Sequence, residues 1–123
     1  MTKKIILSDA APAPIGPYSQ AVLFGNTLYV SGQIALATFE SGASIEEETN
    51  QVMKNIGSVL LEAGFVFEDV VKCSIFVKNM NDFGAINGVY ATYFSENPPA
   101  RETVEVARLP KDVRVEISCI AHK

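Results

Sequence analysis

The chain has 123 residues, of which 48% are hydrophobic and 20% are charged, with 14 acidic and 10 basic side chains. This length and apolar fraction are typical of one globular domain, residues 1–123, and exclude a disordered or collagen-like chain. The net charge of −4 and the dispersed basic residues argue against nucleic-acid binding, which depends on neutralising phosphates. No apolar run reaches the ~18 residues of a membrane span, and the start of the chain lacks a signal-peptide pattern. We therefore expect a soluble cytoplasmic protein that binds neither nucleic acid nor membrane.

The first half of the chain predicts a hairpin that follows a loop. Residues 3–7 form a short apolar run, and residues 9–17, with three prolines and a glycine, indicate an extended surface loop. Residues 21–24 and 27–33 flank Gly25-Asn26, a two-residue turn signal, and therefore predict a β-hairpin.

After a connection over residues 35–42, the chain predicts two helices and three more strands. Ser44 and Glu47 form a capping box ahead of an amphipathic helix that ends at Gly64. The remaining elements are a strand over 69–78, a helix from Asn81 or Asp82 that ends at Asn97-Pro98-Pro99, and strands over 102–109 and 112–121, separated by Pro110-Lys111. Together these elements predict an α+β fold of two layers, a mixed six-stranded sheet with both helices on one face.

Alternation along the predicted strands separates an apolar face, which the helices should cover, from a half-polar face. The apolar rows are Leu28 with Val30, Val71 to Val77 in steps of two, Val104 with Val106, and Val113 to Ala121 in steps of two. The opposite face carries Tyr29, Ser31, Gln33, Arg101, Thr103 and Glu116. Two helices cannot cover both faces, so the half-polar face must meet water, a ligand or another copy of the chain.

The rarer reactive side chains exclude several kinds of site. Cys73 and Cys119 form no CxxC pair, and no Cys/His spacing indicates a metal site. We interpret both cysteines as small core side chains. The only histidine, His122, is the penultimate residue, a poor place to hold the base of a Ser-His-Asp or Cys-His system.

Motifs along nearly the whole chain resemble a known family. They are residues 15–21 (Ile-Gly-Pro-Tyr-Ser-Gln-Ala), 30–33 (Val-Ser-Gly-Gln), Asn55, Ala63-Gly64, 69–72, 80–83, Asn87, Tyr90, 99–101 (Pro-Ala-Arg), 104–110 and 115–117. In combination they resemble the RidA (YjgF-type) family of reactive-intermediate deaminases. One departure is Thr103, which stands where some members have cysteine, so no thiol role is carried over there.

The resemblance implies a chorismate-mutase-like fold and a homotrimer with clefts between its subunits. It also implies hydrolysis of 2-imino acids, such as 2-iminobutanoate and 2-iminopropanoate, to 2-oxo acids and ammonia, without a cofactor or metal. Such imines are released by pyridoxal-phosphate enzymes that dehydrate threonine and serine.

Three residues are candidates for catalysis. The guanidinium of Arg101 can hold a carboxylate bidentately, although a surface or intersubunit salt bridge would use the same group. Glu116 can hold and polarise a water, or be an ordinary solvated strand residue. Tyr18 can bond to the substrate or close its pocket, or simply pack on the sheet edge.

Four further positions are candidates for substrate binding. Ser31 can orient the substrate but lacks a histidine that would make it a nucleophile. Gly32 permits close backbone approach, and the Thr103 N–H can donate to the imine. Asn87 either contacts the substrate or only stabilises a subunit contact. We interpret the remaining charged motif residues as structural ion pairs: Glu105, Arg108 and Asp112.

Two alternatives stay open. The first is a binding module that senses 2-oxo acids or similar small carboxylates without turnover. The second is an RNA-directed role, translation inhibition or RNA cleavage, which the acidic balance and the lack of an aromatic and basic stripe oppose.

Overall fold

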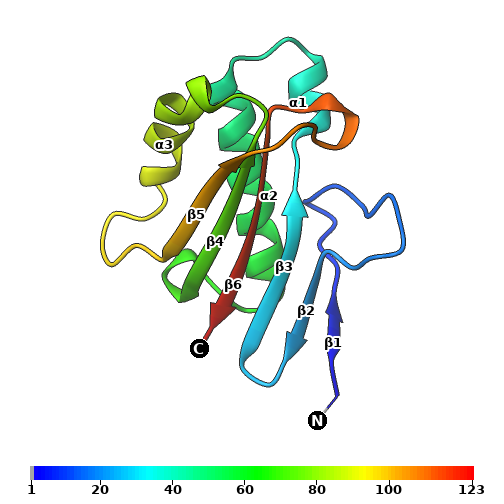
Figure 1. Cartoon of the computed structure of the whole chain (residues 1–123). Coiled ribbons are helices and arrows are strands. Elements are labelled where there is room, and N and C mark those ends of the chain that lie inside the picture. The colour runs from blue at the N-terminus through cyan, green and yellow to red at the C-terminus, as the bar shows by residue number, and fades with distance from the viewer. Residues whose placement is uncertain (1) are drawn as a thin grey trace.

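A computed structural model describes residues 2–123 and shows one mixed sheet of six strands (Figure 1). The strands lie side by side in the order β1-β2-β3-β6-β4-β5, and only the β4–β5 pair is parallel. Their bounds are β1 Lys4–Ile6, β2 Ala21–Phe24, β3 Thr27–Gln33, β4 Val70–Val77, β5 Ala100–Glu105 and β6 Val115–His122. The β2–β3 hairpin has the predicted bounds, and Gly25 occupies the left-handed region of its turn at φ +62°.

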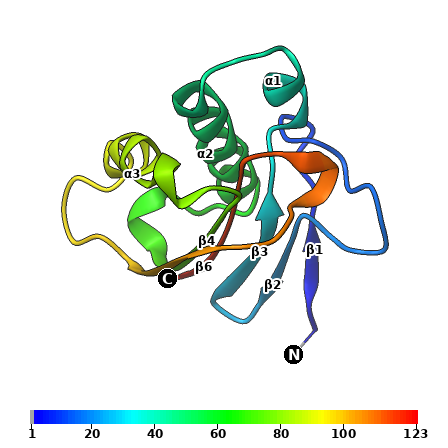
Figure 2. The same cartoon turned by 45° about the horizontal axis from the view of Figure 1, so that its top comes forward.

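The helices lie on one face of the sheet and leave the other face open (Figure 2). They are α1 (Leu36–Glu40), α2 (Ile45–Glu62) and α3 (Phe83–Ala91). This arrangement confirms the predicted α+β fold with a mixed six-stranded sheet, but it has a third helix. Helix α1 lies in the segment predicted as a connection; it has five residues, no side-chain cap and no acidic residue in its first turn, so it lacks the usual helix signals.

Helix α2 forms as predicted. The Glu47 N–H donates to Ser44 Oγ at 3.1 Å, the Ser44 N–H faces Glu47 Oε1 at 3.4 Å, and Gly64 has φ +83° after the last turn. Its inner face buries side chains that include Val52, Met53, Ile56, Val59 and Leu60 against the sheet.

The later elements have different ends from those predicted. Helix α3 ends at Ala91, although Tyr93 and Phe94 beyond it still pack on Phe67. Strand β5 ends at Glu105 because β4, its only neighbour, ends at Val77. Strand β6 begins at Val115 because a 3-10 turn, Pro110–Asp112, carries left-handed residues that an extended strand cannot contain.

Two bulges change which side chains are buried. Between Val70 and Lys72 the pairing with β6 shifts, so Val70 is buried and Val71, which was expected in the apolar row, is exposed. A second shift between Val30 and Gln33 turns Gln33 to the buried face, where it is 5% exposed. Because side chains alternate strictly, one extra residue is enough to reverse a face assignment.

Strand β5 also corrects the face assignment. Its parallel register places Arg101 beside Cys73 and Thr103 beside Ile75, both of which are buried under the helices. Arg101 and Thr103 therefore lie on the helix-covered face, and Val104, expected in the apolar row, is 41% exposed on the open face. The prediction that β5 side chains alternate was right, but the set that faces the helices was assigned wrongly. The side of α3 that faces β5 accommodates the Arg101 guanidinium.

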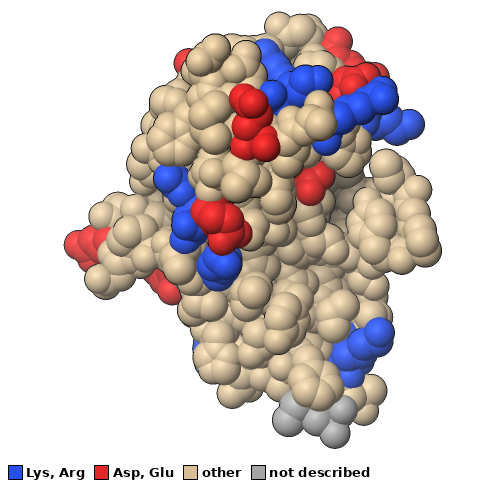
Figure 3. Space-filling view, viewed as in Figure 1, with Lys and Arg blue, Asp and Glu red and all other residues tan. Residues whose placement is uncertain are grey.

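Figure 3 shows the open face, where Lys, Arg, Asp and Glu side chains gather toward the upper end and in a mixed cluster on the left, and the lower middle is largely uncharged. Exposed apolar side chains on this face include Ile5 and Tyr29, whose register partners Val22 and Ile120 continue the row. Within residues 2–123, no helix has both the length and the apolar character that crossing a bilayer requires.

Candidate functional site

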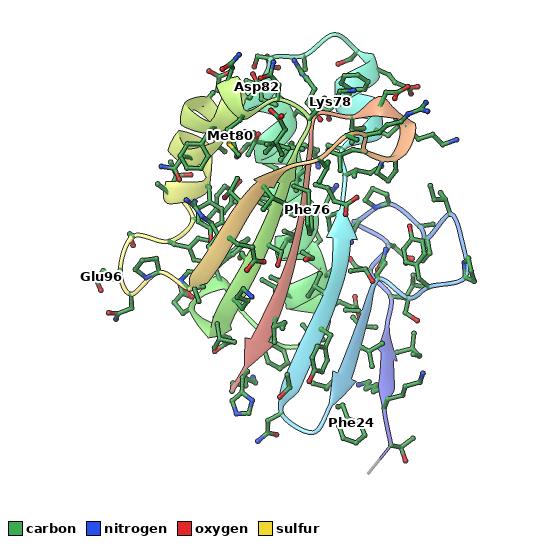
Figure 4. The ribbon with its side chains drawn as sticks, in the orientation of Figure 1. Phe24, Phe76, Lys78, Met80, Asp82 and Glu96 are labelled. Carbon is green, nitrogen blue, oxygen red and sulfur yellow. The ribbon has the colours of Figure 1, made fainter. Side chains whose placement is uncertain are left out.

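The predicted site residues separate into two groups on opposite faces of the sheet. Tyr18, Ser31, Gly32 and Glu116 line one pocket, whereas Asn87 and Arg101 line another. Glu116 is paired with Phe76 across β6 and β4 on the open face, which is the face toward the viewer around the Phe76 label in Figure 4. A single chain therefore does not bring Arg101 and Glu116 together.

The first group surrounds a pocket of about 350 Å³, here called the Glu116 pocket. The bulge in β3 brings Gly32 against the Glu116 side chain, so that a Cβ at position 32 would lie 2.5 Å from Glu116 Oε2. Glycine is thus required at this position for the carboxylate to occupy its place. The lining residues are Ile15, Tyr18, Ser31, Gly32, Ile34, Pro110 and Glu116.

The Glu116 side chain is half-buried, and this burial raises the pKa of its carboxyl above the ordinary value of 4.5. Within residues 2–123 no neighbouring charge or hydrogen bond offsets that effect. A carboxylate with a raised pKa is a stronger base than one in water, which suits it to accept a proton from an attacking water.

Two hydroxyl side chains line this pocket, and they differ in whether the hydroxyl proton is already used in a hydrogen bond. Ser31 Oγ donates to the Ser19 carbonyl at 2.6 Å, so its proton is already used and it can offer a substrate only a lone pair. The Tyr18 ring is 48% exposed, and its hydroxyl accepts from the Ile15 N–H at 3.4 Å. Of these two groups, only the Tyr18 hydroxyl has a proton free to donate to a ligand.

The second group forms a pocket of about 360 Å³ beside α3, here called the Arg101 pocket. Arg101 Nη1 donates to Asn87 Oδ1 at 2.7 Å, and its guanidinium carbon lies 5.0 Å from the Tyr90 ring centre and 5.6 Å from the Phe83 ring centre. We call Asn87, Phe83 and Tyr90 the Arg101 clamp. Pro98 and Pro99 line the same pocket just before β5 and stiffen the approach to Arg101.

The clamp changes the interpretation of two predicted residues and adds two. Asn87 holds Arg101 with its amide oxygen, which makes it a positioning group. Phe83 and Tyr90 belong to the motifs of the family resemblance but were not among the predicted site residues. Their contact with a guanidinium could not be foreseen without knowing which face of β5 carries Arg101. Thr103 lies on this face as well, and its Oγ1 and the Tyr90 hydroxyl are buried without a partner among the described residues.

The predicted ion pairs are found in part. Arg108 and Asp112 form an exposed pair at 2.8 Å. Glu105 instead accepts the Met80 N–H at 2.7 Å, beside the turn where Figure 4 labels Met80. An unpredicted buried pair joins Arg114 to Glu48, which is fully buried, at 2.7 Å.

The remaining reactive side chains lie outside both pockets. Cys73 and Cys119 face each other across β4 and β6, and burial raises the pKa of both thiols, which keeps them protonated and unreactive. His122 Nδ1 lies 3.0 Å from Thr27 Oγ1 at the end of the sheet. Neither arrangement resembles a nucleophile with its base.

Comparison with known proteins identifies the family of the chain. Residues 8–123 match the family model described as Endoribonuclease L-PSP. A RutC family protein of Synechocystis is 52% identical over 98% of this chain and 97% of its own, and the 2-iminobutanoate/2-iminopropanoate deaminase of Rattus norvegicus is 47% identical over 97% of this chain and 89% of its own. The solved structure of E. coli TdcF with bound serine superposes with a TM-score of 0.91 at 38% identity, covering 98% of each chain. The chain therefore belongs to the Endoribonuclease L-PSP family, which is the YjgF/RidA family that its motifs indicate.

Proposed function

We propose that the protein hydrolyses 2-imino acids, including 2-iminobutanoate and 2-iminopropanoate, to 2-oxo acids and ammonia. The observation that carries this proposal is the desolvated Glu116 carboxylate, held against Gly32 in a pocket large enough for a small acid. The rat relative bears the name of this activity, and the TdcF structure holds serine, a ligand with the same carboxylate.

The reaction needs one water and no covalent intermediate. Glu116 takes a proton from the water as its oxygen attacks C2 of the imine, and it passes this proton to the nitrogen as the C=N bond becomes single. In the resulting carbinolamine Glu116 moves the hydroxyl proton to the nitrogen in the same way. A C=O bond then forms, the C–N bond breaks and ammonia leaves. Because such imines already react with water, positioning and charge stabilisation by Arg101, Tyr18 and a main-chain N–H, for which we propose that of Thr103, are sufficient.

We further propose that the complete site lies between two copies of the chain. Arg101 is on the edge strand β5 beside α3, whereas the Glu116 pocket is on the open face, between β6, the end of β3 and the loop that joins β1 to β2. If the partner subunit's Arg101 reaches this Glu116 pocket, one substrate can touch both. Such a contact joins unlike surfaces, and it generates a ring when the rotation between successive copies closes; the number three comes from the family resemblance.

A coupled assay tests the activity. Threonine dehydratase generates the imine, and semicarbazide traps it. The protein should suppress semicarbazone formation and increase 2-oxobutanoate, while the sum of the two products stays unchanged. Titration calorimetry with 2-oxobutanoate runs in parallel. Binding without suppression would instead support the small-carboxylate sensor, and neither binding nor suppression would reject both readings.

Two further measurements test the assembly and the RNA-directed alternative. Light scattering should give about three times the 13.3 kDa chain mass throughout the assay range, and a fully active monomer would contradict the shared site. Tag-free protein should show no RNA binding with the steep salt dependence that phosphate neutralisation produces. RNA binding of that kind would revive the activity that the family model's description names. A cytoplasmic location remains part of the proposal.

A further inference from the structure

Asn55 belongs to the motifs of the family resemblance, but it lines neither the Glu116 pocket nor the Arg101 pocket. It lies in α2 on the side that faces the sheet, and it is only 2% exposed. Both ends of its side-chain amide are used: Nδ2 donates to the Ile34 carbonyl at 3.2 Å, and Oδ1 accepts from Gln51 Nε2 at 2.9 Å. Burying an amide costs free energy unless these bonds are made, so α2 and the Ile34 carbonyl hold each other in place.

The Ile34 carbonyl lies where β3 leaves the sheet. The bulge between Val30 and Gln33 comes just before it, and Gln33 is the last residue of the strand. The buried Gln33 side chain donates its Nε2 to the Ser31 carbonyl at 3.4 Å, within the bulge itself. Because a bulge interrupts the regular ladder of backbone hydrogen bonds, other groups have to fix its shape. The Asn55 bond ties this bulge to α2.

The contact between Gly32 and Glu116 depends on the shape of the bulge. Glu116 Oε2 lies so close to the Gly32 backbone that a Cβ there would be 2.5 Å away. A displacement of the bulge by a fraction of an ångström would therefore open the contact and admit water to the carboxylate.

The surroundings of the Glu116 carboxylate contain no charge among residues 2–123. The side chains around it come from the loop before β2, the end of β3, β4 and the turn before β6: Ile15, Tyr18, Ser31, Ile34, Phe76 and Pro110. Of these, only Tyr18 is titratable, and the one charge proposed to approach from outside is the partner subunit's Arg101. Burial is therefore what raises the pKa of Glu116 within the chain.

Another buried polar residue of α2 holds the strand that carries Glu116. Glu48 lies about two turns earlier in the helix, and its Oε2 accepts the Arg114 N–H at 2.9 Å while its Oε1 accepts from Arg114 Nε at 2.7 Å. Arg114 is two residues before Glu116, just as Ile34 is two residues after Gly32. One helix thus anchors both segments that meet at the contact.

We propose that Asn55 is a positioning residue for Glu116: by holding the Ile34 carbonyl, it keeps the bulge of β3 in contact with the carboxylate. The proposal rests on the function above, in which Glu116 accepts a proton from water. Asn55 touches neither the substrate nor that water. When the end of β3 is released from Asn55, the carboxylate gains water, and the base becomes weaker and less well placed.

The test measures the Glu116 carboxyl directly. Carbon NMR of protein labelled at the glutamate side-chain carboxyl follows each titration, and Glu116→Gln identifies the signal by its loss. Asn55→Leu has the same branched shape and favours a helix but cannot donate a hydrogen bond, so the pKa of Glu116 should fall toward 4.5 by about half a unit or more. In the imine assay the acidic limb of kcat should move to lower pH by the same amount, with kcat lowered about fivefold to tenfold and 2-oxobutanoate affinity nearly unchanged.

The matched control is Val59→Ala, which truncates a fully buried side chain about one turn further along the same side of α2. It should lower the melting temperature and yet leave the Glu116 titration and the acidic limb in place, because the Ile34 carbonyl keeps its donor. Gln51→Ala breaks only the other bond of Asn55 and should also keep both. If Asn55→Leu does not fold, Asn55→Ala removes the same donor without adding apolar volume.

An Asn55→Leu protein whose Glu116 pKa and acidic limb equal those of wild type would overturn the positioning role, as would an equal shift in Val59→Ala. Failure of the proposed function is a separate result. Wild type would then accelerate no imine, while the carboxyl titration would still report whether Asn55 sets the environment of Glu116.

Discussion

The two pockets hold their charged groups in opposite ways. Arg101 is held in place: its Nη1 donates to the Asn87 amide oxygen, and two aromatic ring centres lie 5.0 and 5.6 Å from its guanidinium carbon. Glu116 is desolvated, rests against a glycine, and has no partner that offsets its burial among residues 2–123. One group is positioned and the other is left reactive.

This difference matches the roles that the two groups would have. A carboxylate holder gains from being fixed before the substrate arrives, because less freedom is lost on binding. A base gains from being poorly solvated, because its proton affinity rises. The open face offers a direct comparison: on the exposed Glu102, the Ser74 hydroxyl and Lys72 lower the pKa of the carboxyl, whereas burial raises that of Glu116.

Removing the base should produce the largest effect. Glu116→Gln keeps the shape of the side chain but cannot accept a proton, and general-base losses are typically about 10²- to 10⁴-fold in turnover. Binding of 2-oxobutanoate, measured by calorimetry, should change far less. Equal losses of turnover and binding would contradict a role in water activation.

The pH profile sharpens the same comparison. Activity should fall as the pH drops through the raised pKa of Glu116, so the acidic limb lies above 4.5. A carboxyl whose pKa is raised by folding contributes stability below its unfolded pKa and loses it as the pH rises through the folded pKa. Glu116→Gln should therefore be at least as stable as wild type at pH 7 in thermal unfolding. Glu102→Gln is the matched control and should retain the acidic limb.

Replacing Arg101, which is proposed to hold the substrate carboxylate, should have the next largest effect. Arg101→Ala removes a charge-assisted contact to the substrate carboxylate, which costs on the order of 2–5 kcal/mol in kcat/KM. Arg101→Lys should recover little, since an ammonium lacks the planar fork and cannot satisfy both Asn87 and a carboxylate in the same geometry. The effect should appear in KM and in 2-oxobutanoate affinity. A folded Arg101→Ala protein with near-normal hydrolysis would remove the basis of the proposed site.

A smaller effect should come from the contact between the bulge and the base. In Gly32→Ala the new methyl would lie 2.5 Å from Glu116 Oε2, so the carboxylate has to turn away. We expect a loss of about tenfold in turnover, since the base is displaced but still present. Gly84→Ala in α3, where nothing lies within 4 Å of the added Cβ, is the control and should not lower activity.

Sequence reasoning identified most of the elements and named Arg101 and Glu116 as candidates, but it could not tell which face of the sheet each of them occupies. The capping box and Gly64 define α2 locally, and the Gly25-Asn26 turn defines the hairpin, so both were correct. Alternation is also local, but the face of the sheet that each set of side chains occupies depends on register and bulges. The bulges at Val30–Gln33 and Val70–Lys72 and the parallel register of β5 arise from pairing between strands that are distant in the sequence. For this reason Arg101 and Glu116 were expected on one face and lie on two.

The smallest effect tests the clamp itself. Phe83 is 36% exposed, so Phe83→Leu keeps apolar packing but removes one aromatic face from the guanidinium; cation–π contacts at exposed sites are worth about 0.5–1 kcal/mol. KM and 2-oxobutanoate Kd should rise about twofold to fivefold with kcat unchanged. Tyr90→Phe keeps the ring and removes a hydroxyl that has no partner, so it should leave both constants within twofold. The decisive measurement is a double-mutant cycle: if Phe83 acts through Arg101, Phe83→Leu has no effect on substrate in an Arg101→Ala background, whereas an equal loss in both backgrounds would assign Phe83 to general packing of α3.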